Sequence, residues 1–272
     1  VTAIHNAAST GFSRSNISRY DSGRPSYSQD TLDKIMSVVD SCNEGNPNLS
    51  LCEIGAGTGK FTKALVEHLG DREFEMLAIE PSEFVEHLMN LLLPNVSVKI
   101  GTGEDIPAED RCMDGVMIAQ AFHWMANNRC LTDIHRVLKP GKPLILVWNG
   151  YDTRVNWISH FESSIILPRY PKPPDHVPRF QSMEWQSLFE TKEAHTMFTV
   201  PKTVYSSKTI TGDVNMLINR ALSTSVIANK SEAVHEEVAD EVRKLVMTHP
   251  ETRGKDTFDL VYRTHIAYMV KK

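Results

Sequence analysis

Three glycines at alternate positions, Gly55, Gly57 and Gly59, are the residues whose spacing most clearly indicates chemistry. They follow a short apolar run, Leu49 to Ile54, and precede a segment in which apolar residues recur at helical spacing from Phe61. Such glycines mark a strand-to-helix turn where the backbone takes positive φ or lets a ligand approach closely. The helix that follows points free N–H groups and its positive dipole end at that ligand. The stretch therefore predicts a site for a nucleotide-like molecule.

Neighbouring residues separate the ligand classes that use such a turn. A phosphate-binding P-loop requires glycine at the position of Ile54 and Ser or Thr at that of Phe61, so the sequence does not match it. A dinucleotide fingerprint requires glycine where Lys60 stands, which weakens that assignment without excluding it. The acidic residue Glu53, two positions before the first glycine, remains as the distinguishing feature.

A second acid, Glu80, ends the next predicted strand, Phe74 to Ile79. In a βαβ unit, an acid about 20 residues past the glycine turn faces the ribose of a bound nucleoside and accepts hydrogen bonds from its hydroxyls. The alternative to a binding role is a structural one, in which Glu80 is an exposed glutamate that caps the following helix. Because the glycine turn stands upstream at the right distance, we favour the binding role.

Two further strands are expected at Val96 to Ile100 and Met113 to Ala119. The first runs into the loop GTGEDIP, and the second runs into Gln120-Ala121-Phe122-His123-Trp124. Ligands of open α/β sheets lie at the carboxyl ends of the strands, so both loops should border the site.

Composition limits the partners and the compartment. The 272 residues carry a net charge of −5 with a pI near 6.1 and no basic block, which argues against a nucleic-acid partner. The cysteines show neither metal-ligand spacing nor a disulfide pattern, which indicates no metal and a reducing environment. The longest apolar runs, such as Pro143 to Trp148, are too short to span a bilayer, and the amino terminus lacks a signal-peptide pattern. We expect a cytoplasmic protein that uses no membrane, and the oligomeric state stays open.

These motifs together resemble the class I S-adenosylmethionine-dependent methyltransferases. Glu53 before G-x-G-x-G is the pattern of their cofactor site. The phrases AQAFHW and RVLKPG, with the strand LVWN, resemble a small-molecule branch, the methyltransferase type 11-like proteins, which includes trans-aconitate-type carboxyl methyltransferases. The order of motifs agrees from Phe12 to Asn149, and beyond it only the general layout agrees. The [DN]-P-P-[YF] motif of nucleic-acid amino-methyltransferases does not follow the fourth strand.

The resemblance implies an α/β fold with a Rossmann-like, seven-stranded, mostly parallel sheet, its last strand antiparallel. Helices should cover both faces, and a cap should lie over the active-site end. The expected parts of a single domain, 1–272, are a lid arm at 1–27, a cofactor-binding core at 28–150, a cap insertion at 151–180 and a C-terminal part with substrate-capping helices at 181–272.

Within the C-terminal part, Ala194 to Ser206 is expected to form the sixth strand, interrupted by Pro201. Phe258 to Val270 alternates as the last strand, which should lie antiparallel beside the sixth. By resemblance, the helix Val214 to Leu222 and the triplet Ser223 to Ser225 cap the substrate.

The activity implied is in-line transfer of a methyl group from S-adenosylmethionine, leaving S-adenosylhomocysteine, to an oxygen or nitrogen of a small-molecule acceptor, with a carboxylate among the candidates. The expected cofactor contacts are Glu53, Gly55, Ala56, Gly57, Thr58, Gly59, Glu80, Pro81, Thr102, Gly103, Glu104, Gln120 and Ala121. The expected substrate or lid contacts are Tyr20, Arg24, His123, Trp124 and Trp157. His160, Phe161 and Tyr170 are further candidates for a substrate pocket, with packing in a small core as the alternative.

His123 has three open roles at this stage: a general base, a hydrogen-bond partner that orients the acceptor, or a brace beside Trp124. Two alternative functions also remain. One is a non-catalytic protein that binds S-adenosylmethionine or a nucleoside, and the other is an NAD-dependent oxidoreductase.

Overall fold

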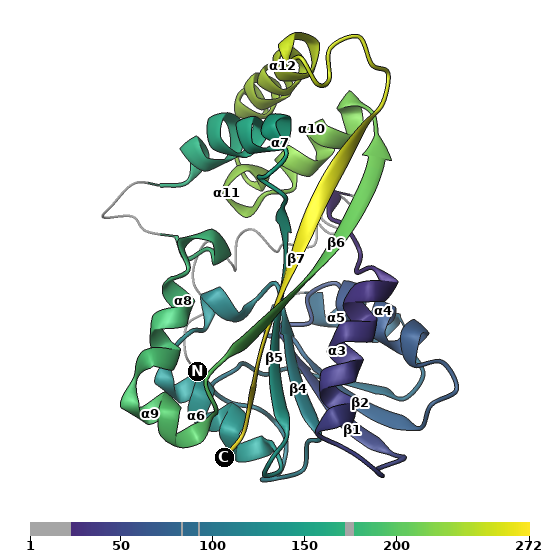
Figure 1. Cartoon of the computed structure of the whole chain (residues 1–272), viewed down its shortest axis with the longest axis vertical. Coiled ribbons are helices and arrows are strands. Elements are labelled where there is room, and N and C mark those ends of the chain that lie inside the picture. Colours follow the sequence, from purple (N-terminus) through teal and green to yellow (C-terminus); the bar gives the residue numbers. More distant parts are fainter. Residues whose placement is uncertain (1–22, 83, 92, 172–176) are drawn as a thin grey trace.

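The computed structural model describes residues 23–272 except 83, 92 and 172–176 (Figure 1). The protein is built on a sheet whose strands are β1 to β7. Their bounds are β1 Leu49–Ile54, β2 Phe74–Ile79, β3 Val96–Lys99, β4 Gly115–Ala119, β5 Pro143–Tyr151, β6 Lys202–Gly212 and β7 Phe258–Val270. They form a seven-stranded sheet in the order β3-β2-β1-β4-β5-β7-β6. Strand β1, which carries the glycine turn, is therefore near the centre.

The five strands from β3 to β5 are parallel, whereas β7 runs antiparallel to both of its neighbours, β5 and β6. The mostly parallel sheet with an antiparallel last strand is confirmed. Since parallel strands end at the same edge, the loops after β1, β2, β3 and β4 meet there, as the sequence predicts.

Helices lie on both faces of this sheet (Figure 1). Their bounds are α3 Gln29–Ser41, α4 Lys60–Leu69, α5 Phe84–Asn90, α6 Asn128–Val137, α7 Asn156–Phe161, α8 Glu184–Ser187, α9 Lys192–Met197, α10 Val214–Leu222, α11 Ser225–Ala228 and α12 Glu232–Thr248. Within the described ranges, no helix is long and apolar enough to cross a membrane.

The alternating direction of the side chains along β1 explains why helices cover both faces of the sheet. Leu49 and Leu51 pack in one apolar cluster with α3 and α4, whereas Cys52 and Ile54 pack in another with α6, α8 and α9. All four side chains are at most 1 % exposed. Successive side chains of a strand point to opposite faces, so a nearly continuous apolar run is what a strand buried on both faces requires.

A third apolar cluster lies beyond the carboxyl edge of the sheet, where β6 and β7 extend past the other strands (Figure 1). It gathers α7, α10, α11 and α12 around Phe258, Leu260 and Tyr262 of β7. The long strand β7 thus joins the sheet and this helical cluster in one element.

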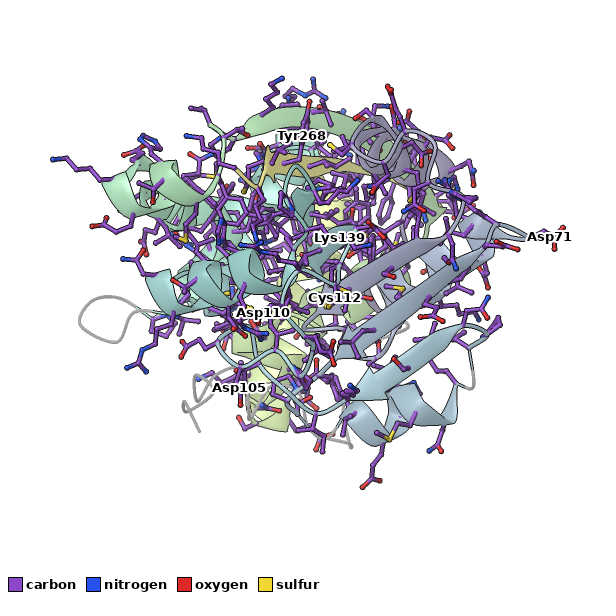
Figure 2. All side chains as sticks on the ribbon, turned by 90° about the horizontal axis from the view of Figure 1, so that it is seen from below. Asp71, Asp105, Asp110, Cys112, Lys139 and Tyr268 are labelled. Atoms are coloured by element: carbon purple, nitrogen blue, oxygen red, sulfur yellow. The ribbon has the colours of Figure 1, made fainter. Side chains whose placement is uncertain are left out.

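An ion pair holds the opposite, amino-terminal edge. Asp114, just before β4, accepts the Ser50 backbone N–H at 3.0 Å and the Lys139 ammonium at 2.8 Å. Figure 2 looks at the protein from below and shows Lys139 and Cys112 near the middle of this view, with Asp71 at its margin. The pair fixes β1 against β4 at the edge away from the glycine turn.

The predicted sixth strand is wrong in its position. Residues from Lys192 to Met197 form α9, whose N-cap Thr191 accepts the Ala194 backbone N–H at 3.2 Å. Ala194 and Phe198, four residues apart, are both 1 % exposed, because they are buried on one side of a helical turn. Strand β6 begins only after Pro201 and continues to Gly212.

Candidate active site

The glycine turn after β1 serves both close packing and ligand access. Gly55, Gly57 and Gly59 all have positive φ, of 73°, 58° and 80°. A Cβ atom on Gly55 would lie 2.7 Å from the Ala121 Cβ, so only glycine lets the loops after β1 and β4 touch. A Cβ atom on Gly57 would find its nearest neighbour, Phe84, only at 4.0 Å. Gly57 therefore leaves space over the turn, at the amino-terminal end of α4.

Glu80 ends β2 with its carboxylate directed at this turn. One oxygen accepts the Gly57 backbone N–H at 2.7 Å, and the other accepts the Ser82 backbone N–H at 2.9 Å. The residue is 6 % exposed. Each carboxylate oxygen can accept more than one hydrogen bond, so Glu80 is held in place with acceptor capacity left for a ligand.

Glu53 lies beneath the turn and is 1 % exposed. The pKa of Glu53 is raised to about 8, mainly by burial; the nearby negative charge of Glu80 adds to the rise, and a 2.6 Å hydrogen bond from the Thr62 hydroxyl acts in the opposite direction. At neutral pH the free protein therefore carries Glu53 mostly as the neutral acid. A positively charged group on a ligand would favour the carboxylate instead.

The loop after β3 is closed by its own polar groups. Thr102 and Asp105 exchange two backbone hydrogen bonds of 3.3 Å, and the Thr102 hydroxyl accepts the Glu104 backbone N–H at 3.3 Å. Glu104 accepts the Asn127 side-chain amide at 2.7 Å. Gly103 packs so closely on Met125 that a Cβ would meet its sulfur at 2.7 Å. Thr102 thus stabilises the turn of this loop.

Gln120, the first residue after β4, has a strained backbone. Its φ is +62°, which is uncommon for a residue other than glycine. Its backbone N–H donates to Val147 O at 2.8 Å, and its side chain donates to Asn149 O at 3.4 Å. Non-glycine residues held in this region cluster at functional sites, and Gln120 lies between two cavities.

The first cavity, of about 60 Å³, lies over the glycine turn, and the second, of about 80 Å³, lies beside it beneath the third cluster. The first is lined by Arg24, Pro25, Tyr27, Glu53, Gly55, Ala56, Gly57, Thr58, Lys60, Phe61, Ala119, Gln120, Asn149 and Arg220. The second is lined by Arg24, Gln120, His123, Trp124, Asn149, Tyr151, Ile166, Tyr170, Arg179, Phe180, Gln181, Arg220, Thr224 and Ser225. Four residues line both, so the two cavities are neighbours that share a wall.

Arg24 belongs to that shared wall. Its guanidinium donates to Ser223 O at 3.2 Å, and its carbonyl accepts the Lys60 ammonium at 2.9 Å. Ligand sites usually enclose about 300 Å³ or more. Both cavities are much smaller than this.

The second cavity is rich in cations and hydrogen-bond donors. Three arginines line it, Arg24, Arg179 and Arg220, and no Asp or Glu does among the described residues. The Arg220 guanidinium lies over the Tyr151 ring, 4.9 Å from its centroid. Burial raises the pKa of the Tyr151 hydroxyl, which therefore stays neutral and able to donate.

Three polar atoms of this cavity are shielded from solvent and have no hydrogen-bond partner in the described part of the chain: Tyr151 Oη, Arg220 Nε and Thr224 Oγ1. A buried polar group without a partner is costly. A ligand with several acceptor oxygens would satisfy all three.

His123 lines the second cavity from a 3₁₀ turn, Phe122–Trp124, that follows β4. Its Nδ1 accepts the indole N–H of Trp148 at 3.2 Å. Burial, with a smaller contribution from the positive charge of Arg24, lowers the pKa of His123 to about 3. The imidazole is therefore neutral across the physiological range.

Of the expected cofactor contacts, Glu53, Gly55, Ala56, Gly57, Thr58 and Gln120 line the first cavity, whereas Gly59, Glu80, Pro81, Thr102, Gly103, Glu104 and Ala121 are not among its lining residues. Of the expected substrate or lid contacts, Arg24, His123 and Trp124 line the second cavity, as does the further candidate Tyr170. Trp157 and Phe161 lie instead in the third cluster, and Trp157 meets Phe258 edge-on at 5.2 Å. The ring of His160 packs against His249 at 5.8 Å. Tyr20 lies outside the described residues.

Sequence reasoning missed several lining residues as site residues, among them Lys60, Asn149, Arg179 and Arg220. Asn149 had a usable signal, since it follows the buried run of β5 at the carboxyl edge. The helix that carries Arg220 was assigned to substrate capping only by resemblance, because a single arginine on an amphipathic helix has no local signature.

A wider hollow, of about 590 Å³, lies elsewhere on the molecule along β1, β2 and β3, with Glu75, Ser97 and Cys112 in its wall. It shares no described lining residue with the two cavities at the glycine turn.

Known proteins with similar sequences are methyltransferases. Residues 52–146 match a family model described as a methyltransferase domain. An uncharacterised methyltransferase of Mycobacterium tuberculosis is 30 % identical over 250 residues, 92 % of this chain and 91 % of that protein. An uncharacterised methyltransferase-like protein of Schizosaccharomyces pombe is 31 % identical over 257 residues, 92 % of each chain. This chain belongs to the class I S-adenosylmethionine-dependent methyltransferases.

Solved structures agree with the methyltransferase fold. A candidate type II methyltransferase from Anaeromyxobacter dehalogenans superposes with a TM-score of 0.61 at 16 % identity, over 91 % of this chain and 97 % of the other. A phosphoethanolamine N-methyltransferase of Haemonchus contortus, solved with S-adenosylhomocysteine, gives 0.54 at 11 % identity, over 100 % of this chain and 60 % of the other. At these identities the likeness concerns the fold.

The residues at the glycine turn of this methyltransferase fit S-adenosylmethionine. Gly57 leaves room where a side chain would fill the turn, Glu80 is fixed beside it, and Glu53 lies beneath it. The turn combines two carboxyl groups, which accept hydrogen bonds, with the free N–H groups at the amino-terminal end of α4. This combination suits a ligand that carries hydroxyls, an ammonium and a carboxylate.

Proposed function

We propose that this methyltransferase transfers the methyl group of S-adenosylmethionine to a carboxylate oxygen of a small molecule bound in the second cavity. The observation that carries the proposal is Arg220. Its guanidinium lines both cavities, and its shielded Nε–H finds no acceptor in the part of the chain that the structure describes.

The first cavity would hold the cofactor. Glu80 would accept hydrogen bonds from the ribose hydroxyls, Glu53 would face the ammonium end, and the loop of Thr102, Gly103 and Glu104 would border the base. Bound S-adenosylmethionine supplies a methyl group already activated by its sulfonium, and transfer to a carboxylate oxygen yields a methyl ester and S-adenosylhomocysteine with no proton to remove. The protein then has to orient the acceptor and exclude water, and such positioning can supply roughly 7 to 11 kcal/mol.

The charge of the second cavity supports an anionic acceptor. Arg24, Arg179 and Arg220 repel a protonated amine and attract a carboxylate. A guanidinium also matches the two oxygens of a carboxylate with two parallel hydrogen bonds. Glu162 interacts with Arg179 and Arg220, and burial raises the pKa of its carboxyl.

A carboxylate acceptor is also favoured because its methylation needs no catalytic base. A hydroxyl or an ammonium group has to lose a proton when it is methylated, whereas a carboxylate at neutral pH does not. Among the described residues that line the second cavity, His123 is the group that would have to act as a base, and its neutral imidazole is already bonded to Trp148.

The segments around the second cavity would form its cap. Arg24 of the amino-terminal arm, Tyr170 after α7, and Arg220 of α10 approach it from three parts of the chain. The third apolar cluster holds α7 and α10 in place behind these residues. Closing them over the acceptor would exclude water from the reaction.

The test is methyl transfer from radiolabelled S-adenosylmethionine to a panel of short carboxylates, with alcohols and amines of the same carbon skeletons, and to a metabolite extract. We expect labelled methyl esters, which release volatile methanol in mild alkali, whereas methyl ethers and methylamines do not. Products stable to alkali would contradict the carboxylate acceptor. No binding of S-adenosylhomocysteine in calorimetry would contradict the cofactor assignment.

Arg220→Gln tests the residue that carries the proposal. Because a hydrogen bond to a charged group is worth about 1.5 to 3 kcal/mol, the KM for the carboxylate should rise at least about tenfold. Since Arg220 lines both cavities, the affinity for S-adenosylhomocysteine has to be measured alongside. Arg243→Gln is the matched control, because Arg243 pairs with Asp240 on the exposed side of α12. An unchanged KM in Arg220→Gln would overturn the proposal.

A further inference from the structure

The side chain of Trp148, near the end of β5, is enclosed by aromatic rings next to the second cavity. Its side chain is fully buried, and its ring packs on Phe180 at 4.8 Å and on Trp185 at 4.5 Å. Its indole N–H is a donor only, so it must face an acceptor when it is buried. That acceptor is Nδ1 of His123, at 3.2 Å.

This hydrogen bond fixes the tautomer of His123. A neutral imidazole has one nitrogen with a proton and one with a lone pair. Because Nδ1 accepts from Trp148, the lone pair lies there and the proton lies on Nε2. A proton on Nδ1 would place two N–H groups against each other, so Trp148 opposes both the other tautomer and the imidazolium.

The charged groups around His123 act in the same direction. Arg24 of the amino-terminal segment, Arg179 after α7, and Arg220 of α10 all line the cavity that His123 faces. All three are cations, and the described lining of this cavity holds no carboxylate that would stabilise an imidazolium. Burial and the charge of Arg24 accordingly lower the pKa of His123 to about 3.

We propose that Trp148 acts as a positioning residue that holds His123 as an Nε2–H donor to the bound acceptor, and that His123 is not a general base. A base needs its lone pair on the side of the substrate, whereas here the lone pair is directed at Trp148. In the function proposed above, on which this role rests, the Nε2–H would bind one carboxylate oxygen and leave the other oxygen free for the methyl group.

The tautomer can be measured without any acceptor. In protein labelled with ¹⁵N-histidine, long-range proton–nitrogen spectra distinguish a protonated Nε2 from a protonated Nδ1, and the His123 signals are those missing in His123→Gln. We expect the Nε2–H tautomer, unchanged between about pH 5.5 and 8. An Nδ1–H tautomer, or a titration near pH 6 to 7, would overturn the proposal even if the carboxylate function holds.

Trp148→Phe removes the donor and keeps an aromatic ring in the stack. In this variant the His123 signals should become a mixture of tautomers, while burial and the charge of Arg24 still keep the imidazole neutral. Unchanged signals would show that Trp148 does not set the tautomer. Should the variant fail to fold, the spectra of the unmutated protein still decide the tautomer.

Kinetics test the donor role. His123→Leu should lower kcat/KM for the methylated carboxylate at least about tenfold, whereas His123→Gln, whose amide N–H replaces Nε2–H, should restore most of it. His195→Gln, on the exposed side of α9, is the matched control. The pH profile of kcat/KM in the unmutated protein should show no ionisation of His123. A base role predicts the reverse, namely an ionisation near pH 6 to 7 that disappears in both His123 variants.

Discussion

The carboxylate of Glu80 accepts the backbone N–H of Gly57 at 2.7 Å, which joins the end of β2 to the turn after β1. The bond fixes the acid in the free protein, before any ligand is present. Glu80→Ala should therefore weaken the binding of S-adenosylhomocysteine by about 1.5 to 3 kcal/mol, roughly 10- to 100-fold in Kd. Calorimetry measures this, with Glu75→Ala as the control, because Glu75 is an exposed acid on the same strand. Equal losses in both variants would contradict the role of Glu80.

Glu53 should couple cofactor binding to proton release. Its pKa is raised to about 8 in the free protein, and the ammonium group of the ligand should lower it, so Glu53 loses a proton on binding. At pH 6.5, calorimetry with S-adenosylhomocysteine in buffers of different ionisation enthalpy should report release of about one proton, and affinity should rise between about pH 5.5 and 7.5. Glu53→Gln should abolish the release. Proton release that persists in this variant would assign it to another group.

The contact between Gly55 and Ala121 should be visible in stability. Gly55→Ala places a Cβ 2.7 Å from that of Ala121 and holds alanine at positive φ, so the free energy of unfolding should fall by at least about 1 to 3 kcal/mol. In Gly55→Ala/Ala121→Gly the contact disappears and only the backbone strain remains. Urea denaturation should show that the double variant loses less than the sum of the single variants, and strict additivity would exclude the contact as the cause.

His265 should make the protein sensitive to acid. Burial, with a smaller contribution from Arg263, lowers the pKa of His265 to about 4, whereas the unfolded chain has a value near 6.5. Between these values the unfolded state binds a proton that the folded state does not, so stability falls as the pH drops from about 6.5 to 4. His265→Phe keeps a ring among Trp148, Phe180 and Tyr205 and should reduce this dependence in urea denaturation, while the lowered pKa of His123 leaves a part of it. The exposed-site variant His195→Gln should retain the full slope.

Local patterns predicted much of the fold correctly. The apolar runs of β1 and β2 and the change to helical spacing after the glycine turn are all present. The error at Ala194 has a physical cause. A short stretch with few apolar residues fits both the helical and the strand period. The helix is favoured by the Thr191 hydroxyl, which caps its first turn, and by the apolar cluster that buries Ala194 and Phe198.

The sequence by itself predicted the proposed cofactor end of the site, because Glu53, the glycine turn and Glu80 lie within one βαβ unit whose geometry follows from local spacing. Only the tertiary structure brought together the residues of the proposed acceptor end. Arg24 bonds to Ser223, 199 positions away, and Trp148 meets His123 across the ends of two strands. Such contacts depend on how β5, β7 and the third cluster pack together. The folded arrangement alone gathers three arginines around one cavity and places the indole N–H of Trp148 against Nδ1 of His123.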